Sequence, residues 1–508
     1  MSSSAVAHEA AAPADDAQDG SPGTERLWKE ARKQLPRTFW LWPALLTLGL
    51  GVRGSWRPEL WRDELATWSA ATRSTGQLIA VLHHVDAVSG AYYLLMHYWV
   101  SAFGDSPTVF RLPSALAMAG AAALVALTAR KQFGVPAGLV AGLLFAVLPS
   151  VSRFAQEARS YAFAVLAVAA ATYLLLRALE RPDWQRWLPY GAAVAAAGLF
   201  HMVSLSVLAP HAVVAGMRWW RQRRRALLIG FPATVAAALL PVVPLVILGH
   251  RQVGRQISWL QSPTFQQFSA VWHGLFQSSL VGGCVLCLVA LPAAWPKGRR
   301  AAFEIGLVAA LPIVLIWYVS QGHTAYFLDR YLLFTVPAWA VLAGAGLTAL
   351  RPRALIAIGL VGTAWIGLQD QQHLRERNSH ELADERGAAR IIAQGYRPGD
   401  GMAPVRGDQS YMMLNFAIEY YLPRSVQPKD VFAEESPVQH KDLYAVECPQ
   451  PAACAAGVPR IWVVDYTDPD QPFKGFSKAQ QQVLETEYTK VESKHVSGIT
   501  VTLLQRQH

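Results

Sequence analysis

Apolar stretches follow one another from Phe39 to about Leu368, separated by short charged clusters, and the chain on either side is polar. A membrane-spanning helix needs roughly 20 mostly apolar residues, within a range of about 17–25. The pattern therefore predicts a polytopic α-helical membrane protein with about eleven transmembrane helices. The expected spans are 38–54, 108–129, 136–151, 160–178, 188–203, 204–218, 226–248, 272–294, 302–320, 331–350 and 354–369.

The same pattern divides the chain into three parts. Residues 1–37 are rich in Ala, Ser, Gly and Asp and lack the apolar core of a signal peptide, which is typical of a disordered cytoplasmic tail. Residues 38–370 form the predicted membrane domain. In 371–508, a capped helical pattern at 379–396 and strand patterns in "PRIWVVDY" and "GITVTLLQR" predict an extracytoplasmic α/β domain.

The basic clusters predict the orientation, because cytoplasmic loops collect Lys and Arg. With the expected spans, every cluster falls on the same side of the membrane. The N-terminus is then cytoplasmic, and the C-terminal domain lies outside the plasma membrane. The clusters are Arg26/Lys29/Arg32/Lys33/Arg37, Arg130/Lys131, Arg177/Arg181/Arg186, Arg218/Arg221/Arg223/Arg224/Arg225, Lys297/Arg299/Arg300 and Arg351/Arg353.

The apolar stretch 90–104 is a test of this arrangement. If it crossed the bilayer, every later basic cluster would move to the outside. The stretch is shorter than a span and carries His97 in its middle. We therefore expect an amphipathic or re-entrant helix on the outer face, within a first outer loop at 54–107.

Composition agrees with a membrane protein and narrows its partners. Of 508 residues, 53% are hydrophobic and 16% charged. The cytoplasmic loops largely account for the net charge of +10, so we expect no nucleic-acid partner. Cys448 and Cys454 lie close together in the external domain and predict a disulfide. Cys284 and Cys287 lie in an apolar run and are expected to be small hydrophobic residues, although a redox or zinc CxxC is the alternative.

Unusual ionisable residues collect on the expected outer face, where such groups are functional-site candidates. The segment "GSWRPELWRDELATWSAATRS" (54–74) places Asp63 beside Glu64, and His83, His84 and Asp86 follow in the same loop. Arginines are uncommon on this side and need a counter-ion or an anionic ligand. The candidates in the later outer loops are Arg153, Glu157, Arg159, Tyr161, His201, Arg251, Arg255, His323, Asp329, Arg330 and Tyr331.

These residue types favour sugar transfer from a lipid phosphate. An attacking acceptor hydroxyl needs a carboxylate to take its proton, and Asp63 is our candidate. A leaving phosphate needs forked cationic donors, which Arg159 and Arg330 supply. Simpler interpretations remain: Asp63 and Glu64 could cap a helix, the Arg–Glu and Arg–Asp neighbours could be ion pairs, and His201 could be a structural interfacial histidine.

Four stretches occur in an order that resembles the GT-C superfamily of polytopic glycosyltransferases. They are "WRDELAT" (61–67), "YYLLMHYWVSAFGDSPTVFRLPSAL" (92–116), "QEARSYAF" (156–163) and "DRYLLFTVPA" (329–338). The resemblance is to the family 39-like group, which includes protein O-mannosyltransferases and lipid A aminoarabinose transferases. It implies a catalytic carboxylate at Asp63 supported by Glu64, and two surface helices after this pair. It also implies donor phosphate and sugar binding at Glu157, Arg159, Arg330 and Tyr331.

The chain departs from that group at two points. Family members often carry a proline pair or a lysine before the second surface helix, where this chain has "AVSGAYY", so no lysine role is transferred. No C-terminal MIR-type β-trefoil pattern is present, which disfavours a eukaryotic protein O-mannosyltransferase.

The expected function is an inverting transfer of a sugar, first mannose, from a polyprenyl phosphate to a glycan, glycolipid or protein hydroxyl in the cell envelope. Arabinofuranose is the alternative donor sugar. Donor contacts are expected from Arg153, Glu157, Arg159, Tyr161, His201, His323, Arg330 and Tyr331. We expect no cofactor or metal, although the sequence leaves a divalent cation open. A transporter or flippase of lipid-linked sugar is the alternative class, but the middles of the expected spans are Ala, Leu and Val rather than ionisable.

Overall fold

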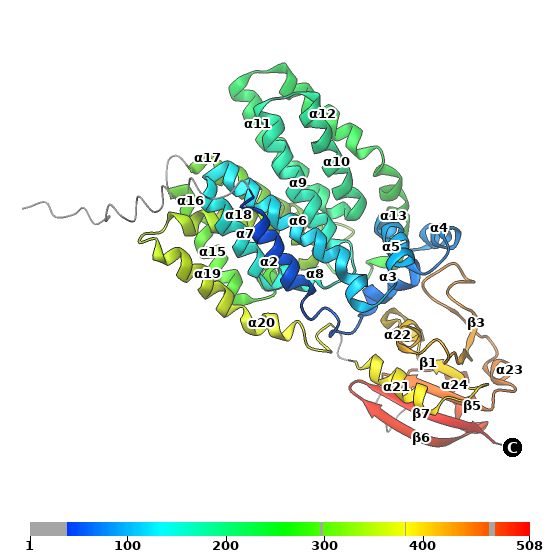
Figure 1. Ribbon diagram of the computed structural model, residues 1–508. Helices are drawn as coiled ribbons and strands as arrows, with labels where there is room; N and C mark the ends of the chain where they lie inside the picture. Colours follow the sequence, from blue (N-terminus) through cyan, green and yellow to red (C-terminus); the bar gives the residue numbers. More distant parts are fainter. Residues whose placement is uncertain (1–37, 295–297, 381–382, 467–472, 508) are drawn as a thin grey trace, which may run out of the picture. The chain divides into compact units, whose positions relative to one another are not determined.

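From Leu41 to His373 the described chain consists mainly of packed helices, and a mixed sheet with flanking helices follows (Figure 1). This computed structural model describes residues 38–294, 298–380, 383–466 and 473–507, and Trp40–His508 form one compact unit. The predicted tail at 1–37, with its basic cluster, and Lys297 lie outside the described residues.

Each expected span corresponds to a helix or to a pair of helices. Within the described residues, four helices are long and apolar enough to cross a membrane, and three bent pairs would bring the number to seven. The chain is thus a multi-pass membrane protein, and the number of about eleven spans stays a prediction. The helices of this region are α2 (Leu41–Val52), α6 (Pro107–Phe133), α7 (Val135–Val147), α8 (Pro149–Ala155), α9 (Tyr161–Glu180), α10 (Trp184–Phe200), η2 (Met202–Val207), α11 (Leu208–Gln222), α12 (Arg225–Leu239), α13 (Val243–Gln256), α14 (Phe265–Phe276), α15 (Ser279–Val289), α16 (Leu291–Ala294), α17 (Arg299–Val319), η3 (Asp329–Thr335), α18 (Val336–Ala349), α19 (Ala354–Ile366) and α20 (Leu368–His373).

Small residues let the central helices approach closely. A Cβ on Gly344 of α18 would lie 2.4 Å from the Ala141 Cα of α7, and one on Gly142 would lie 2.6 Å from Pro43 of α2. In a lipid environment such contacts replace the hydrophobic effect as the main source of helix association. This packing fixes the start of α9 and the position of η3. Arg159 lies just before α9, and Arg330 lies in η3.

The first outer loop folds into three short helices and a single turn, namely α3 (Arg62–Ala71), α4 (Thr75–His84), η1 (Ala87–Ser89) and α5 (Gly90–Phe103). Among the described helices, α5 is absent from the candidate spans, which agrees with a surface helix. Its apolar face packs inward: Tyr92, Tyr93 and Met96 are fully buried, in one cluster with Leu65 and Leu78. His97 lies 3.0 Å from the carbonyl oxygen of Ala71 through Nδ1, so its polar edge is accommodated.

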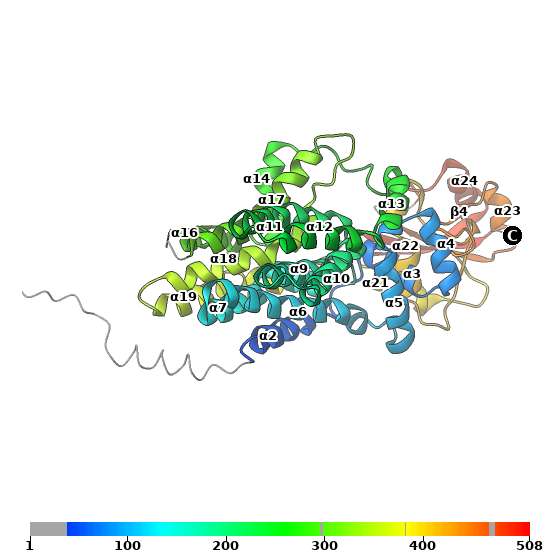
Figure 2. The ribbon, with the colours of Figure 1, turned by 90° about the horizontal axis from the view of Figure 1, so that it is seen from above.

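The segment 249–271, predicted as a loop, is partly helical. α13 is bent by 57° from α12 and continues to Gln256, beyond the end of the apolar pattern on which the predicted span was based. The helix packs on η1, where a Cβ on Gly249 would meet Val88 Cγ1 at 2.4 Å. The Gln252 side chain accepts a hydrogen bond from the Ala87 amide at 2.9 Å and donates one to the Leu82 carbonyl at 2.9 Å. α13 is therefore tied to the outer loop (Figure 2).

The predicted α/β domain contains a five-stranded sheet of order β2-β1-β5-β7-β6. β1 is parallel to both β2 and β5, while β7 is antiparallel to β5 and β6, with Met402 opposite Trp462 and Trp462 opposite Leu503. β5 is buried because its apolar run faces helices and neighbouring strands. The elements are α21 (Glu385–Gly395), β1 (Gly401–Pro404), η4 (Gly407–Met412), α22 (Leu414–Tyr421), β2 (Lys429–Asp430), β3 (Ala433–Glu435), β4 (Val446–Glu447), α23 (Pro451–Ala455), β5 (Arg460–Asp465), α24 (Lys478–Thr486), β6 (Tyr488–Val496) and β7 (Ile499–Arg506). The predicted Cys448–Cys454 disulfide is present.

This C-terminal domain is joined to the outer loop by direct contacts. The Leu60 amide donates to the Tyr421 hydroxyl at 2.8 Å, Arg377 binds Glu59 at 2.7 Å, and Arg73 donates to the Asp442 carbonyl at 2.6 Å. The segment that leads into Asp63 is therefore held by residues more than 300 positions later in the chain.

Candidate functional site

A cavity of about 600 Å³ lies between the outer loop, the adjacent ends of the membrane helices and the C-terminal domain. Six of the residues predicted to act in catalysis or donor binding line it: Asp63, Arg159, Tyr161, His201, Arg330 and Tyr331. Asp86 and Ser89 line it as well, as do Trp259 and Arg255 from the α13 side. The sequence thus located the centre of this cavity through residues from four separate segments.

Asp63 lies in the first turn of α3 but does not cap the helix. Trp61 is the N-cap, and no side chain accepts a capping hydrogen bond there. The Asp63 carboxylate is 23% exposed and lies 4.0 Å from an Nη atom of Arg330. The backbone carbonyl, not the carboxylate, accepts from the Thr67 hydroxyl at 3.1 Å. The carboxylate oxygens are therefore positioned in the cavity, where a substrate hydroxyl could reach them.

Two arginines line the same cavity with hydrogen-bonding capacity to spare. Arg159 donates to the Tyr93 hydroxyl at 3.1 Å and lies 3.9 Å from Asp86. Arg330 stacks over the rings of Trp61 and Tyr331 at 5.5 and 5.8 Å. In each arginine the Nε atom is buried without a hydrogen-bond partner among the described residues. Unsatisfied guanidinium donors beside a cavity suit an anionic oxygen ligand, above all a phosphate.

Three rings stand together beside the arginines. The His201 ring centre is 4.9 Å from that of Tyr331 and 5.5 Å from that of Tyr161. His201 follows α10 at the point where the chain turns into η2, so a helix end presents the imidazole. The aromatic cluster gives this side of the cavity rigid ring faces of the kind that pack against a sugar or a prenyl chain.

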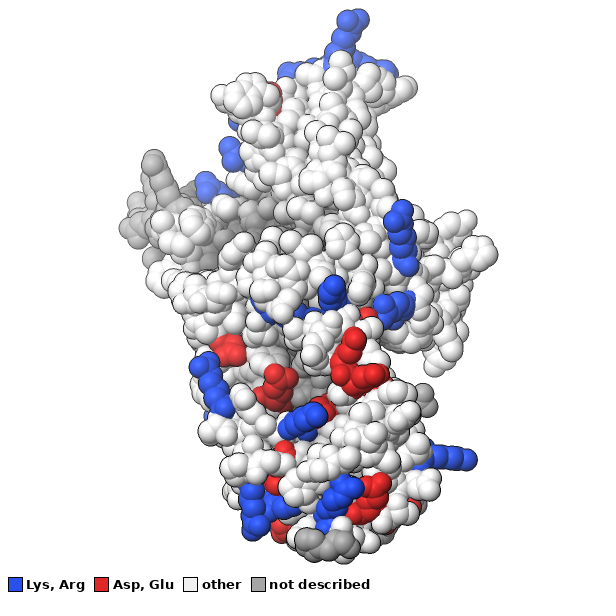
Figure 3. Space-filling model, turned by 90° about the vertical axis from the view of Figure 1, so that its right-hand side faces the viewer, with Lys and Arg blue, Asp and Glu red and all other residues white. Residues whose placement is uncertain are grey.

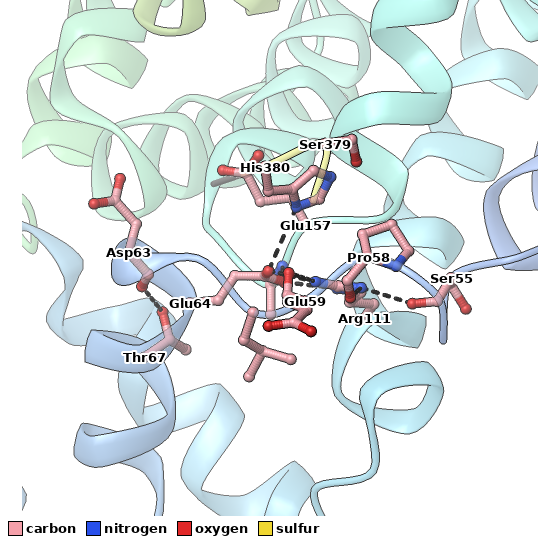
Figure 4. Close-up of polar contacts among 12 residues, drawn as sticks. Ser55, Pro58, Glu59, Asp63, Glu64, Thr67, Arg111, Glu157, Ser379 and His380 are labelled. Atoms are coloured by element: carbon pink, nitrogen blue, oxygen red, sulfur yellow. Dashed lines mark hydrogen bonds and ion pairs between the residues drawn. The ribbon is translucent and has the colours of Figure 1, made fainter. Parts of the chain in front are cut away.

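Glu64 faces away from the cavity and is fully buried (Figure 4). Arg111 of α6 donates to its two carboxylate oxygens at 2.8 and 2.6 Å, and the Ala158 amide donates to it at 2.8 Å. Arg111 also donates to the carbonyls of Ser55, Pro58 and Glu59. Burial alone would raise the pKa of Glu64, but the charge and hydrogen bonds of Arg111 hold that pKa well below its usual range. Glu64 thus fixes the start of α3 from behind Asp63.

Arg153 and Glu157 also lie behind the cavity rather than in its lining, and they form an ion pair with each other. Burial raises the pKa of Glu157 to about 7, against the opposing effect of Arg153, and the neighbouring charges of Glu64 and Asp63 add to the rise. His380, from the segment after α20, lies 3.8 Å from Glu64. Burial, with Arg153 nearby, lowers the pKa of His380 to about 3, so this imidazole is neutral and its contact with Glu64 is not a salt bridge.

His323 is exposed and does not line the cavity, so the structure does not bring it together with the other predicted donor-binding residues. Among the described residues, no group of three or more His, Cys, Asp or Glu could hold a metal ion. Cys284 and Cys287 are free thiols in α15, without such a ligand set.

Several important residues were not singled out by the sequence. Arg111 lies in an apolar helix, and the signal for it was a lone charge inside an expected span. Tyr93 donates to Asp86 and so completes a chain of contacts to Arg159. The C-terminal domain contributes four residues to the lining of the cavity, and no local sequence pattern predicts this contribution. They are Tyr411, Met413, Leu443 and Tyr444.

The sequence model described as dolichyl-phosphate-mannose-protein mannosyltransferase matches residues 91–248. This segment runs from α5 to α13 and includes Glu157, Arg159 and His201. No curated protein sequence matches the chain.

The fold is also that of solved structures. ArnT from Cupriavidus metallidurans in the apo state is 15% identical, with a TM-score of 0.60 over 94% of this chain and 98% of that chain. The same protein bound to undecaprenyl phosphate is 15% identical, with a TM-score of 0.62 over 92% of this chain and 98% of that chain. The similarity covers the membrane helices and the C-terminal domain together. The chain therefore has the fold of these ArnT structures over nearly its whole length, and the mannosyltransferase family model matches residues 91–248 of it.

Proposed function

We propose that the protein transfers mannose from a polyprenyl-phosphate donor to an acceptor hydroxyl, with Asp63 as the general base. The observation that carries the proposal is the convergence of Asp63, Arg159 and Arg330 on one cavity. The fold is shared with a protein solved with undecaprenyl phosphate bound, and the family description names a phosphate-linked mannose donor. The first fact supports a polyprenyl-phosphate donor, and the second favours mannose over arabinofuranose as the donor sugar.

In the proposed reaction, the guanidinium groups of Arg159 and Arg330 hold the donor phosphate. The Asp63 carboxylate takes the proton from the acceptor hydroxyl as its oxygen attacks the anomeric carbon. The bond from that carbon to the phosphate oxygen breaks, and its electron pair stays on the phosphate. Attack on the ring face opposite the phosphate inverts the anomeric configuration.

The two arginines also suit the charge that develops in this step. As the glycosidic bond to phosphate breaks, negative charge grows on the phosphate oxygen. Fixed guanidinium groups in a largely buried site stabilise that charge more than water would, because they need no reorganisation. Arg330 lies 4.0 Å from the Asp63 carboxylate, so it also links the base to the donor side of the cavity.

A donor-consumption assay tests the proposal. Purified protein in detergent is incubated with a short-chain polyprenyl-phosphate β-mannose, and released polyprenyl phosphate and mannose products are measured by mass spectrometry. We expect consumption by the wild-type protein, α-configured products and strong loss in Asp63→Asn. If the protein consumes the corresponding arabinofuranose donor and leaves the mannose donor intact, arabinofuranose is the donor sugar instead of mannose. No consumption of either would contradict the proposed reaction.

We further propose that this cavity lies outside the plasma membrane and that the N-terminus is cytoplasmic. The basic clusters in the described chain lie at the helix ends opposite those that carry the cavity residues, and Lys131 binds Glu180 at 2.6 Å where α6 and α9 end. The test uses an impermeant thiol reagent on intact cells after mild reduction. Labelling of Cys448 or Cys454 is expected, and labelling only after lysis would reverse the orientation.

A further inference from the structure

The two sides of the cavity differ in their chemistry. The side formed by membrane-helix ends carries Arg159 and Arg330, with hydrogen-bonding capacity left over. The side formed by the C-terminal domain consists of Tyr411, Met413, Leu443 and Tyr444, none of which is charged. Although the surface of this domain carries many charges (Figure 3), those side chains do not line the cavity.

The charged groups near this uncharged side are already paired. Arg255 binds Asp442 at 2.8 Å and donates to the His84 carbonyl at 3.2 Å. The Arg62 guanidinium lies over the Tyr411 ring at 5.3 Å and donates to the Met412 sulfur at 3.6 Å. A phosphate or carboxylate on the acceptor would therefore meet cations that are already occupied, unlike the donor phosphate.

Tyr411 lines the same cavity as Asp63, the proposed base. Arg62, whose side chain lies over its ring, immediately precedes Asp63 in the first turn of α3. The Tyr411 side chain is 52% exposed in the described structure, which is unusual for an aromatic ring lining a cavity. Trp259, on the segment after α13, lines the same cavity and is 58% exposed.

From this asymmetry we propose that the acceptor is a neutral carbohydrate, whose terminal ring packs on Tyr411 and Tyr444 of the C-terminal domain. Flat aromatic faces suit the apolar C–H faces of a sugar ring and need no charge on the ligand. One ring hydroxyl then points to Asp63, which takes its proton as the new glycosidic bond forms. This inference deepens the proposed function and depends on it.

The experiment offers the donor together with three classes of acceptor. They are neutral octyl glycosides of mannose, glucose and arabinofuranose, a Ser/Thr-rich peptide, and a phosphorylated disaccharide lipid. Hydrolysis of the donor by water is measured in the same reactions, because it reports donor use without any acceptor. We expect transfer to at least one neutral glycoside in preference to the peptide and the phosphorylated lipid.

Aromatic variants test the placement. Tyr411→Ala and Tyr444→Ala should raise the apparent KM for the glycoside about 5- to 10-fold, roughly the effect of one aromatic contact. The ratio of transfer to hydrolysis should fall by the same factor, and Tyr→Phe should restore both values because the hydroxyl is not needed for packing. Tyr98→Ala is a matched control, since Tyr98 is 61% exposed on α5 and does not line the cavity.

The outcomes separate the two proposals. Donor hydrolysis that Asp63→Asn abolishes, combined with transfer to the peptide or the phosphorylated lipid alone, would overturn the neutral-acceptor proposal and keep the proposed function. Donor hydrolysis without transfer to any glycoside would overturn it too. Wild-type KM values in both Tyr→Ala variants would remove the C-terminal domain from acceptor binding. Absence of donor use would overturn the proposed function itself.

Discussion

Asp63 and Glu64 are neighbours in the sequence but belong to opposite kinds of surroundings. Asp63 faces a cavity, is 23% exposed and lies 4.0 Å from Arg330. Glu64 is fully buried and accepts hydrogen bonds from Arg111 at 2.6 and 2.8 Å and from the Ala158 amide at 2.8 Å. The arginines that line the cavity with Asp63 keep unsatisfied N–H groups, whereas both carboxylate oxygens of Glu64 accept hydrogen bonds. The two neighbouring carboxylates thus have different structural roles: Glu64 supports the fold, whereas Asp63 faces the cavity, as the proposed general base must.

The strongest test of this division is Asp63→Asn, which keeps size and hydrogen bonding but removes basicity. Turnover should fall by about 10²–10⁴-fold, the usual contribution of a positioned base. Thermal stability in detergent and donor binding should stay close to wild type. Asp183→Asn serves as control, because Asp183 is an exposed N-cap far along the chain at α10. Near-normal turnover in Asp63→Asn would assign the base elsewhere.

Glu64→Gln should act on stability instead. It leaves the Arg111 guanidinium buried without its counter-charge, and breaking such a buried pair costs about 3–5 kcal/mol. A lower unfolding temperature in detergent, with turnover reduced in proportion to the folded fraction, is the expected result. A well-folded Glu64→Gln protein without turnover would exchange the roles of the two carboxylates.

The arginines extend the comparison to cations. Arg330→Lys and Arg159→Lys keep the charge but lose the planar fork, so the apparent KM for the donor should rise by about tenfold or more. Arg153→Lys is the matched control, because Arg153 forms an ion pair with Glu157 behind the cavity, and an ammonium can replace it there. Equal donor KM values in all three variants would make the cavity arginines structural.

Glu157 gives the most specific effect, a pH dependence of stability. Its pKa is raised by burial to about 7 in the folded protein, from an ordinary value of 4.5. The folded state therefore holds a proton that the unfolded state releases, and its stability falls as pH rises from about 4.5 to about 7. The loss should be at most roughly 1.4 kcal/mol per pH unit. Glu157→Gln should flatten this part of the curve of unfolding temperature against pH, and identical curves would contradict the raised pKa.

Local sequence patterns were enough to predict the helices and strands, but they did not predict the contacts between residues far apart in the chain. The length of 90–104 and its central His97 were enough to predict α5 as a surface helix, and alternation was enough to predict β7. Asp63, Arg159 and Arg330 could be proposed because charge is costly at membrane depth. The different surroundings of Asp63 and Glu64 could not be predicted, because they depend on Arg111, 47 positions away from Glu64. The positions of Tyr411 and Tyr444 in the cavity lining could not be predicted either, because hydrophobic periodicity does not show which face of one domain contacts which loop of another.

The contacts between the outer loop and the C-terminal domain also imply an order in which the parts of the site are completed. They join Glu59 to Arg377, Leu60 to Tyr421 and Arg73 to Asp442. During synthesis, α3 and the membrane helices emerge first, and the residues that brace the Asp63 segment follow them by more than 300 positions. A chain that stops after α20 would carry Arg159 and Arg330, but it would lack the residues that brace the Asp63 segment and four of the residues that line the cavity. Under the proposed function, such a chain would not consume a lipid-linked donor.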